Sequence, residues 1–146
     1  MRAFAPRVAV LVATLSAVLG CGPSSTPGYP APDFQVASGD PFPLRAGDLA
    51  LVAMPGDFLY VSVQSFGLDT RCPPDAVCAE PGHLVVRFEL EDSSRQGSAQ
   101  ILAPPDGDGV ATFGNFEIRS LQVEPPGRES RILPTDYVLV LQVTAR

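Results

Sequence analysis

Apolar and polar side chains alternate most clearly between residues 84 and 91. Every second residue from Leu84 to Leu90 is apolar, and the intervening positions include Arg87, Glu89 and Glu91. A period of two places the two sets of side chains on opposite faces of a β-strand. We therefore expect a strand here with one buried face and one solvated face.

Two other runs are apolar on both faces, which is typical of strands inside a sheet. The run 136–144 reads DYVLVLQVT and is apolar at almost every early position. The run 57–66 has apolar side chains of both parities, with one set made of Leu59, Val61 and Val63 and the other of Phe58, Tyr60 and Phe66. Both runs are predicted to be central strands.

Shorter runs at 49–54, 98–103 and 110–115 also predict strands. The sequence MPGD follows the first of them and predicts a tight turn into the run 57–66. The sequence PPDGDG, between the second and the third, predicts a hairpin-like connection, since Asp-Gly is common in hairpin turns. A calcium loop is the alternative for DGDG, but the carboxylates that such a loop needs further on are missing.

The run 116–125 alternates with a change of phase. Phe116 and Ile118 share one parity, whereas Leu121 and Val123 share the other. One extra residue in a strand produces such a shift, so a β-bulge is expected near Arg119 or Ser120.

About seven short strands separated by Gly-rich and Pro-rich turns predict an all-β fold. The 16 prolines fall mainly between the runs, where a missing N–H does not interrupt a sheet. No apolar period of 3.6 residues is long enough for a helix, and no repeat is evident. We expect a single antiparallel β-sandwich or small barrel.

The N-terminus has the pattern of a signal peptide. Arg2 and Arg7 precede an apolar run from Val8 to Leu19, and small residues lead to Cys21. As a helix this run would be about 18 Å long, too short for a membrane core of about 30 Å. Residues 1–20 are therefore expected to be cleaved off.

The sequence V-L-G-C, ending at Cys21, resembles the lipobox of bacterial lipoproteins. The resemblance implies cleavage before Cys21 and attachment of acyl chains to it, and two or three such chains anchor a protein stably. An ordinary signal peptide followed by a coincidental cysteine is the alternative. Because Gly22 and not Asp follows this cysteine, the resemblance also implies the outer rather than the inner membrane of the bacterial cell envelope, with the domain on its periplasmic or surface face.

The segment after Cys21 has the composition of a tether. It is rich in Gly, Pro and Ser and cannot form a core. We assign residues 21–40 to the lipidated cysteine and a flexible tether, and residues 41–146 to the β-domain.

The chain is acidic, with 10 basic residues against 16 acidic ones and a net charge of −6. Loss of Arg2 and Arg7 with the signal peptide would bring this to about −8. Such a charge argues against binding nucleic acid and against electrostatic attachment to anionic lipid. The membrane is expected as a partner only through the lipid anchor.

Cys72 and Cys78 remain as a pair once Cys21 is acylated, and a disulfide is the expected state of such a pair outside the cytosol. Pro73 and Pro74 fix φ within the loop and predict a rigid, protruding turn. The candidate contact residues of this loop are Arg71, Pro73, Pro74 and Asp75.

Two alternatives for the cysteine pair have less support. A redox dithiol usually has two residues between its cysteines, whereas five intervene here. A metal site of Cys72, Cys78 and His83 would need a fourth ligand and an unusual spacing. No cofactor or metal is therefore expected.

The loop sequence also carries a family resemblance. Its spacing, D-x-R-C-P-x-x-x-x-C-x-x-x-G from Asp69 to Gly82, resembles the signature of a family of small exported bacterial proteins and lipoproteins. The strand–Pro–loop–strand pattern near the C-terminus is also similar, so that the resemblance spans about residues 49–144. A Trp that is frequent in the family is replaced by Glu80 here. The resemblance implies export and a disulfide loop but no reaction.

Residue types suited to catalysis are scarce. His83 is the single histidine, and no G-x-S-x-G motif is present. We therefore expect a non-catalytic module that binds an envelope protein or a cell-wall partner or has a structural role. An envelope hydrolase or metal-handling protein that uses His83 with nearby carboxylates or cysteines is the alternative.

Overall fold

The computed structural model describes residues 31–105, 108–127 and 133–146. The predicted signal peptide, the predicted lipidation site Cys21 and residues 22–30 of the predicted tether lie outside the described residues. The compact unit Ala31–Arg146 holds the β-domain. Among the described residues, none forms a helix long and apolar enough to cross a membrane.

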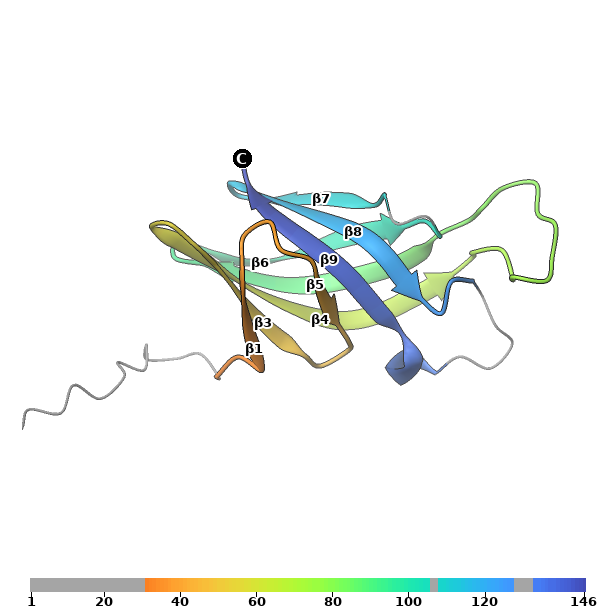
Figure 1. Ribbon diagram of the computed structural model, residues 1–146, viewed down its shortest axis with the longest axis horizontal. Helices are drawn as coiled ribbons and strands as arrows, with labels where there is room; N and C mark the ends of the chain where they lie inside the picture. The colour runs from red at the N-terminus through yellow and green to blue at the C-terminus, as the bar shows by residue number, and fades with distance from the viewer. Residues whose placement is uncertain (1–30, 106–107, 128–132) are drawn as a thin grey trace, which may run out of the picture. The chain divides into compact units, whose positions relative to one another are not determined.

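The domain consists of two packed β-sheets and is a β-sandwich, as the strand pattern predicted (Figure 1). The five-stranded sheet has the order β1 (Phe34–Ala37), β3 (Leu49–Met54), β4 (Asp57–Asp69), β5 (Leu84–Asp92) and β6 (Gln96–Ala103). The four-stranded sheet has the order β2 (Phe42–Leu44), β9 (Val138–Ala145), β8 (Phe116–Glu124) and β7 (Val110–Phe113). One 3-10 turn, η1 (Pro134–Asp136), precedes β9.

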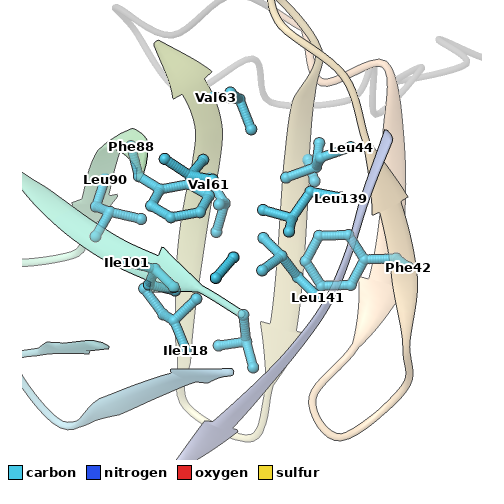
Figure 2. Close-up of a cluster of buried hydrophobic side chains, with 14 of the residues drawn as sticks. Phe42, Leu44, Val61, Val63, Phe88, Leu90, Ile101, Ile118, Leu139 and Leu141 are labelled. Atoms are coloured by element: carbon cyan, nitrogen blue, oxygen red, sulfur yellow. The ribbon is translucent and has the colours of Figure 1, made fainter. Parts of the chain in front are cut away.

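The core lies between the two sheets and is built from the alternating apolar positions. Leu84, Val86, Phe88 and Leu90 of β5 are all buried, which confirms the predicted faces of this strand. Figure 2 shows side chains of the two sheets pointing toward one another: Val61, Val63, Phe88, Leu90 and Ile101 from one, and Phe42, Leu44, Ile118, Leu139 and Leu141 from the other. Each large apolar side chain buried in this way contributes about 1.5–3 kcal/mol.

The strands predicted to be central occupy interior positions. β4 is the middle strand of its sheet, and β9 lies between β2 and β8. The predicted face of Phe66 is wrong, because the register of β4 shifts between Val63 and Ser65. This irregularity changes the parity, so that Phe66 is buried in the core.

The bulge predicted in the run 116–125 is confirmed. The register between β8 and β9 shifts between Ser120 and Gln122, which leaves Leu121 as the extra residue. Val123 thereby returns to the core, and Ser120 is buried with its hydroxyl bonded to the backbone of Gly109.

The predicted hairpin between the runs 98–103 and 110–115 is wrong. β6 and β7 belong to different sheets, so the connection passes from one sheet to the other. The hairpin is instead the next connection along the chain, where Gly114 and Asn115 join β7 to β8. Gly114 has φ 57° in this turn. The turn predicted at MPGD is confirmed, and its Gly56 has φ 80°.

The predicted boundary between tether and domain is wrong for residues 34–40. β1 pairs with β3, and Phe34 packs edge-on against Phe42 of β2. The pairing of β1 with β3 is parallel, so the sandwich is not wholly antiparallel. β1 is a very short strand close to Gly39 and to the prolines that precede it, which made it resemble tether.

Candidate functional site

The segment 70–83 connects β4 to β5 and projects beyond the sheets at one end of the domain (Figure 1). Cys72 and Cys78 form the predicted disulfide, with a Cα–Cα distance of 5.9 Å. Both sulfurs are used in this bond, so neither is a free thiolate for metal binding or redox exchange. We call residues 72–78 the disulfide loop.

Hydrogen bonds extend the sheet into the base of the loop. The Thr70 N–H donates to the His83 carbonyl at 2.9 Å, and the Cys72 N–H donates to the Pro81 carbonyl at 3.0 Å. Within the loop, the Ala76 N–H donates to the Pro73 carbonyl and closes a turn. The disulfide loop is therefore ordered by its backbone as well as by its covalent bond.

The tip of the disulfide loop is exposed and largely apolar. Pro73, Pro74 and Asp75 are exposed, as predicted for contact residues. Val77 has a relative exposure of 105% and contacts little of the domain. The tip thus offers an apolar side chain and two prolines to solvent.

Arg71 does not belong to this exposed tip, so its assignment as a contact residue is wrong. Its exposure is 1%, and its Nε and Nη2 donate to the Asp69 carboxylate at 3.0 and 2.9 Å. Nη1 donates to the Pro125 carbonyl at 2.7 Å. Residues two apart share a face of an extended chain, which brings the opposite charges of Asp69 and Arg71 together.

Asp69, Arg71 and Tyr137 form a polar cluster beneath the loop. The Tyr137 hydroxyl donates to Asp69 Oδ2 at 3.0 Å, and the Arg71 guanidinium lies 5.7 Å from the centroid of the Tyr137 ring. Asp69 ends β4 of one sheet, whereas Tyr137 and Pro125 flank β9 and β8 of the other. The cluster therefore fixes the base of the loop to both sheets.

A second contact supports the loop from the segment after β8. A Cβ on Gly127 would lie 2.6 Å from the Cys72 carbonyl oxygen and 3.0 Å from Pro74 Cδ. Only a glycine permits so close an approach of these two backbones.

The ionisation of the polar cluster follows from its hydrogen bonds. Burial alone would raise the pKa of Asp69, but hydrogen bonds from the Arg71 side chain and backbone, the Arg71 charge and the Tyr137 hydroxyl together lower it below its usual value. Burial raises the pKa of Tyr137, and the bond to Asp69 adds to this effect. The ground state is an Asp69 carboxylate paired with Arg71 and a neutral Tyr137.

This pairing predicts an acid-sensitive contribution to stability. The ordinary pKa of Asp69 is 3.8 and its pKa in the fold is lower, so the stabilisation is complete above 3.8 and disappears as the pH falls through the lower value. Urea unfolding between about pH 5 and 2 should show a smaller loss of stability in Asp69→Asn than in the wild type. Asp92→Asn is the comparison variant, because it removes a second carboxylate whose pKa is lowered but which lies outside the polar cluster. Equal pH profiles for the wild type and Asp69→Asn would contradict the pairing.

His83 lies at the base of the loop, where its backbone makes the contacts. Its N–H donates to the Thr70 hydroxyl at 3.1 Å, and the residue as a whole is half-buried. No group of three His, Cys, Asp or Glu residues in the described part of the chain is arranged to hold a metal. Glu89 accepts a hydrogen bond from Gln64 on the outer face of the sheet. An enzyme that uses His83 stays a prediction from the sequence.

The sequence did not reveal that Asp69 and Tyr137 are hydrogen-bonded to each other and support the loop. Their separation of 68 positions carries no local signal. The Asp-x-Arg spacing was visible, and opposite charges two residues apart at a strand end could have indicated a buried pair.

No protein family model, no curated protein and no solved structure matches this chain. The resemblance to exported bacterial proteins therefore stays a prediction from the loop sequence.

Proposed function

We propose that this chain is a bacterial lipoprotein, anchored through Cys21, whose β-sandwich is a non-catalytic binding or structural module of the cell envelope. The disulfide loop is its contact element, and the partner is an envelope protein or a cell-wall component. The observation that carries this proposal is an exposed loop held rigid by a disulfide, by backbone hydrogen bonds and by the polar cluster. The apolar run from Val8 to Leu19, followed by Gly20 and Cys21, supports the anchor.

The physical advantage of such a loop is a small entropy loss on binding. Ordering a flexible side chain at an interface costs about 0.5–1.5 kcal/mol, and a pre-ordered backbone avoids a further penalty. Pro73, Pro74 and Val77 offer apolar area, whereas Asp75 and Glu80 provide the exposed charges. Arg71 contributes by holding the loop and not by touching the partner.

Cross-linking in intact cells, followed by affinity capture and mass spectrometry, tests the contact role. Replacing Val77 with Ser should reduce partner capture several-fold without changing the fold, because Val77 is fully exposed. The double variant Cys72→Ser/Cys78→Ser should also reduce capture and should lower the free energy of unfolding by about 2 kcal/mol.

Val110→Ser is the matched control, because Val110 is an exposed valine on β7, outside the disulfide loop. Capture that is unchanged by both loop variants, or that Val110→Ser reduces equally, would contradict the contact role. The same spectra report the mass of the N-terminal peptide, and an unmodified Cys21 would contradict the anchor.

A further inference from the structure

The strands at the edges of the two sheets differ greatly in length and composition. β1, β2 and β7 have four, three and four residues, and β2 contains Pro43. β6 has eight residues, QGSAQILA, with no charge and no proline. Natural sheet edges are usually protected by shortness, charge, proline or a bulge. β6 lacks each of these, since its register with β5 is also regular.

The outer backbone of β6 is open along most of its length. One side of the strand pairs with β5 from Gln96 to Ala103. On its other side, no backbone hydrogen bond joins it to a residue in the part of the chain that the structure describes. The segment after β6 returns close to its end, where a Cβ on Gly109 would lie 2.6 Å from the Leu102 carbonyl oxygen. The open stretch is therefore Gln96–Ile101.

We propose that this open edge pairs with the β6 edge of a second copy of the chain. In an antiparallel pair related by a two-fold axis, a charged residue close to the axis would lie near its own copy, and like charges near each other are destabilising. β6 has no charge that would cause this repulsion, although the chain as a whole has a net charge of −6.

The uncharged edge also makes other occupants less suitable. The chain's own segment 22–30 contains three prolines, which lack the N–H groups that pairing requires. A strongly charged partner strand would find no complementary charge on β6 and would gain no electrostatic specificity from it. A neutral strand such as β6 itself fits the edge.

The side chains of β6 suit this pairing. With the axis at Ala99, Ser98 of one copy lies opposite Gln100 of the other, and both side chains can donate and accept hydrogen bonds. Gly97 and Ile101 are opposed on the core side, where Gly97 lies beneath the Phe113 ring. The two five-stranded sheets would then form one continuous sheet.

Sedimentation equilibrium of the full chain in density-matched detergent tests the proposal. We expect a reversible dimer, and Gln100→Lys should raise its dissociation constant about tenfold or more, because charge on an edge strand opposes pairing. Ser98→Lys is a second variant with the same expected effect. Circular dichroism should show an unchanged fold for both variants, since the two side chains are exposed.

Gln35→Lys is the matched control, because Gln35 is exposed on β1 at the opposite edge of the same sheet. It should leave the dissociation constant unchanged. A chain that remains monomeric at every concentration would overturn the proposal. A dimer that Gln35→Lys weakens as much as Gln100→Lys does, or that neither Gln100→Lys nor Ser98→Lys weakens, would overturn it as well.

Discussion

Replacing Arg71 with Leu is expected to lower the free energy of unfolding by about 3–5 kcal/mol, because it leaves the Asp69 carboxylate without its buried partner. The Asp69 carboxylate would lose the two hydrogen bonds that the Arg71 side chain donates. It would also lose the one from the Arg71 backbone N–H if the backbone shifts. The Pro125 carbonyl would lose its donor as well. Urea unfolding followed by circular dichroism measures the change.

Arg119→Leu provides the control, because the Arg119 side chain is 43% exposed and pairs with Glu117 on the surface. Removal of an exposed pair should cost less than about 1 kcal/mol. Arg71→Lys retains the charge but cannot form the two parallel hydrogen bonds, so we expect an intermediate loss. Equal losses for Arg71→Leu and Arg119→Leu would show that the polar cluster does not stabilise the fold.

The alternation of apolar residues predicted much of the sandwich. In β5 the period of two matches the buried face at every position, because each core-facing residue must leave water for the strand to pack. The bulge in β8 was visible for the same reason, since the core requires both Ile118 and Val123. Whether a side chain is buried depends largely on its own polarity, so the local sequence can predict it.

Strand pairing was less accessible because it depends on distant residues. The sequence favoured a hairpin between β6 and β7, yet the chain passes to the other sheet between these strands. β1 and β2 are too short to show a period, and their positions depend on contacts such as that between Phe34 and Phe42. A single strand does not specify its neighbours.

The candidate site was predicted only in part. The disulfide followed from counting cysteines, and the exposure of Pro73 to Asp75 followed from the turn composition. Arg71 was misplaced because an arginine beside a turn is usually solvated, and its burial depends on Asp69 and on Tyr137 from the other sheet. Sequence shows a charge but not the distant groups that surround it.

Replacing Gly82 with Ala is also expected to lower the free energy of unfolding, by about 3 kcal/mol or more. Gly82 has φ 70°, and a Cβ there would lie 1.9 Å from the Thr70 carbonyl oxygen. This oxygen belongs to the backbone and cannot move away as a flexible side chain would. The base of the loop would have to separate, which would break the hydrogen bonds between Thr70 and His83.

Gly47→Ala measures the cost of the backbone conformation without the steric overlap. Gly47 also has a positive φ, of 90°, but a Cβ there would have no atom within 4 Å. Its replacement should therefore cost only the conformational penalty of about 1–2 kcal/mol. Hydrogen exchange adds a local measurement, because the Thr70 and Cys72 amides should lose protection in Gly82→Ala and retain it in Gly47→Ala. If both variants lose the same stability and both amides stay protected, the loop does not depend on close packing at Gly82, and its rigidity must come from the disulfide and the polar cluster alone.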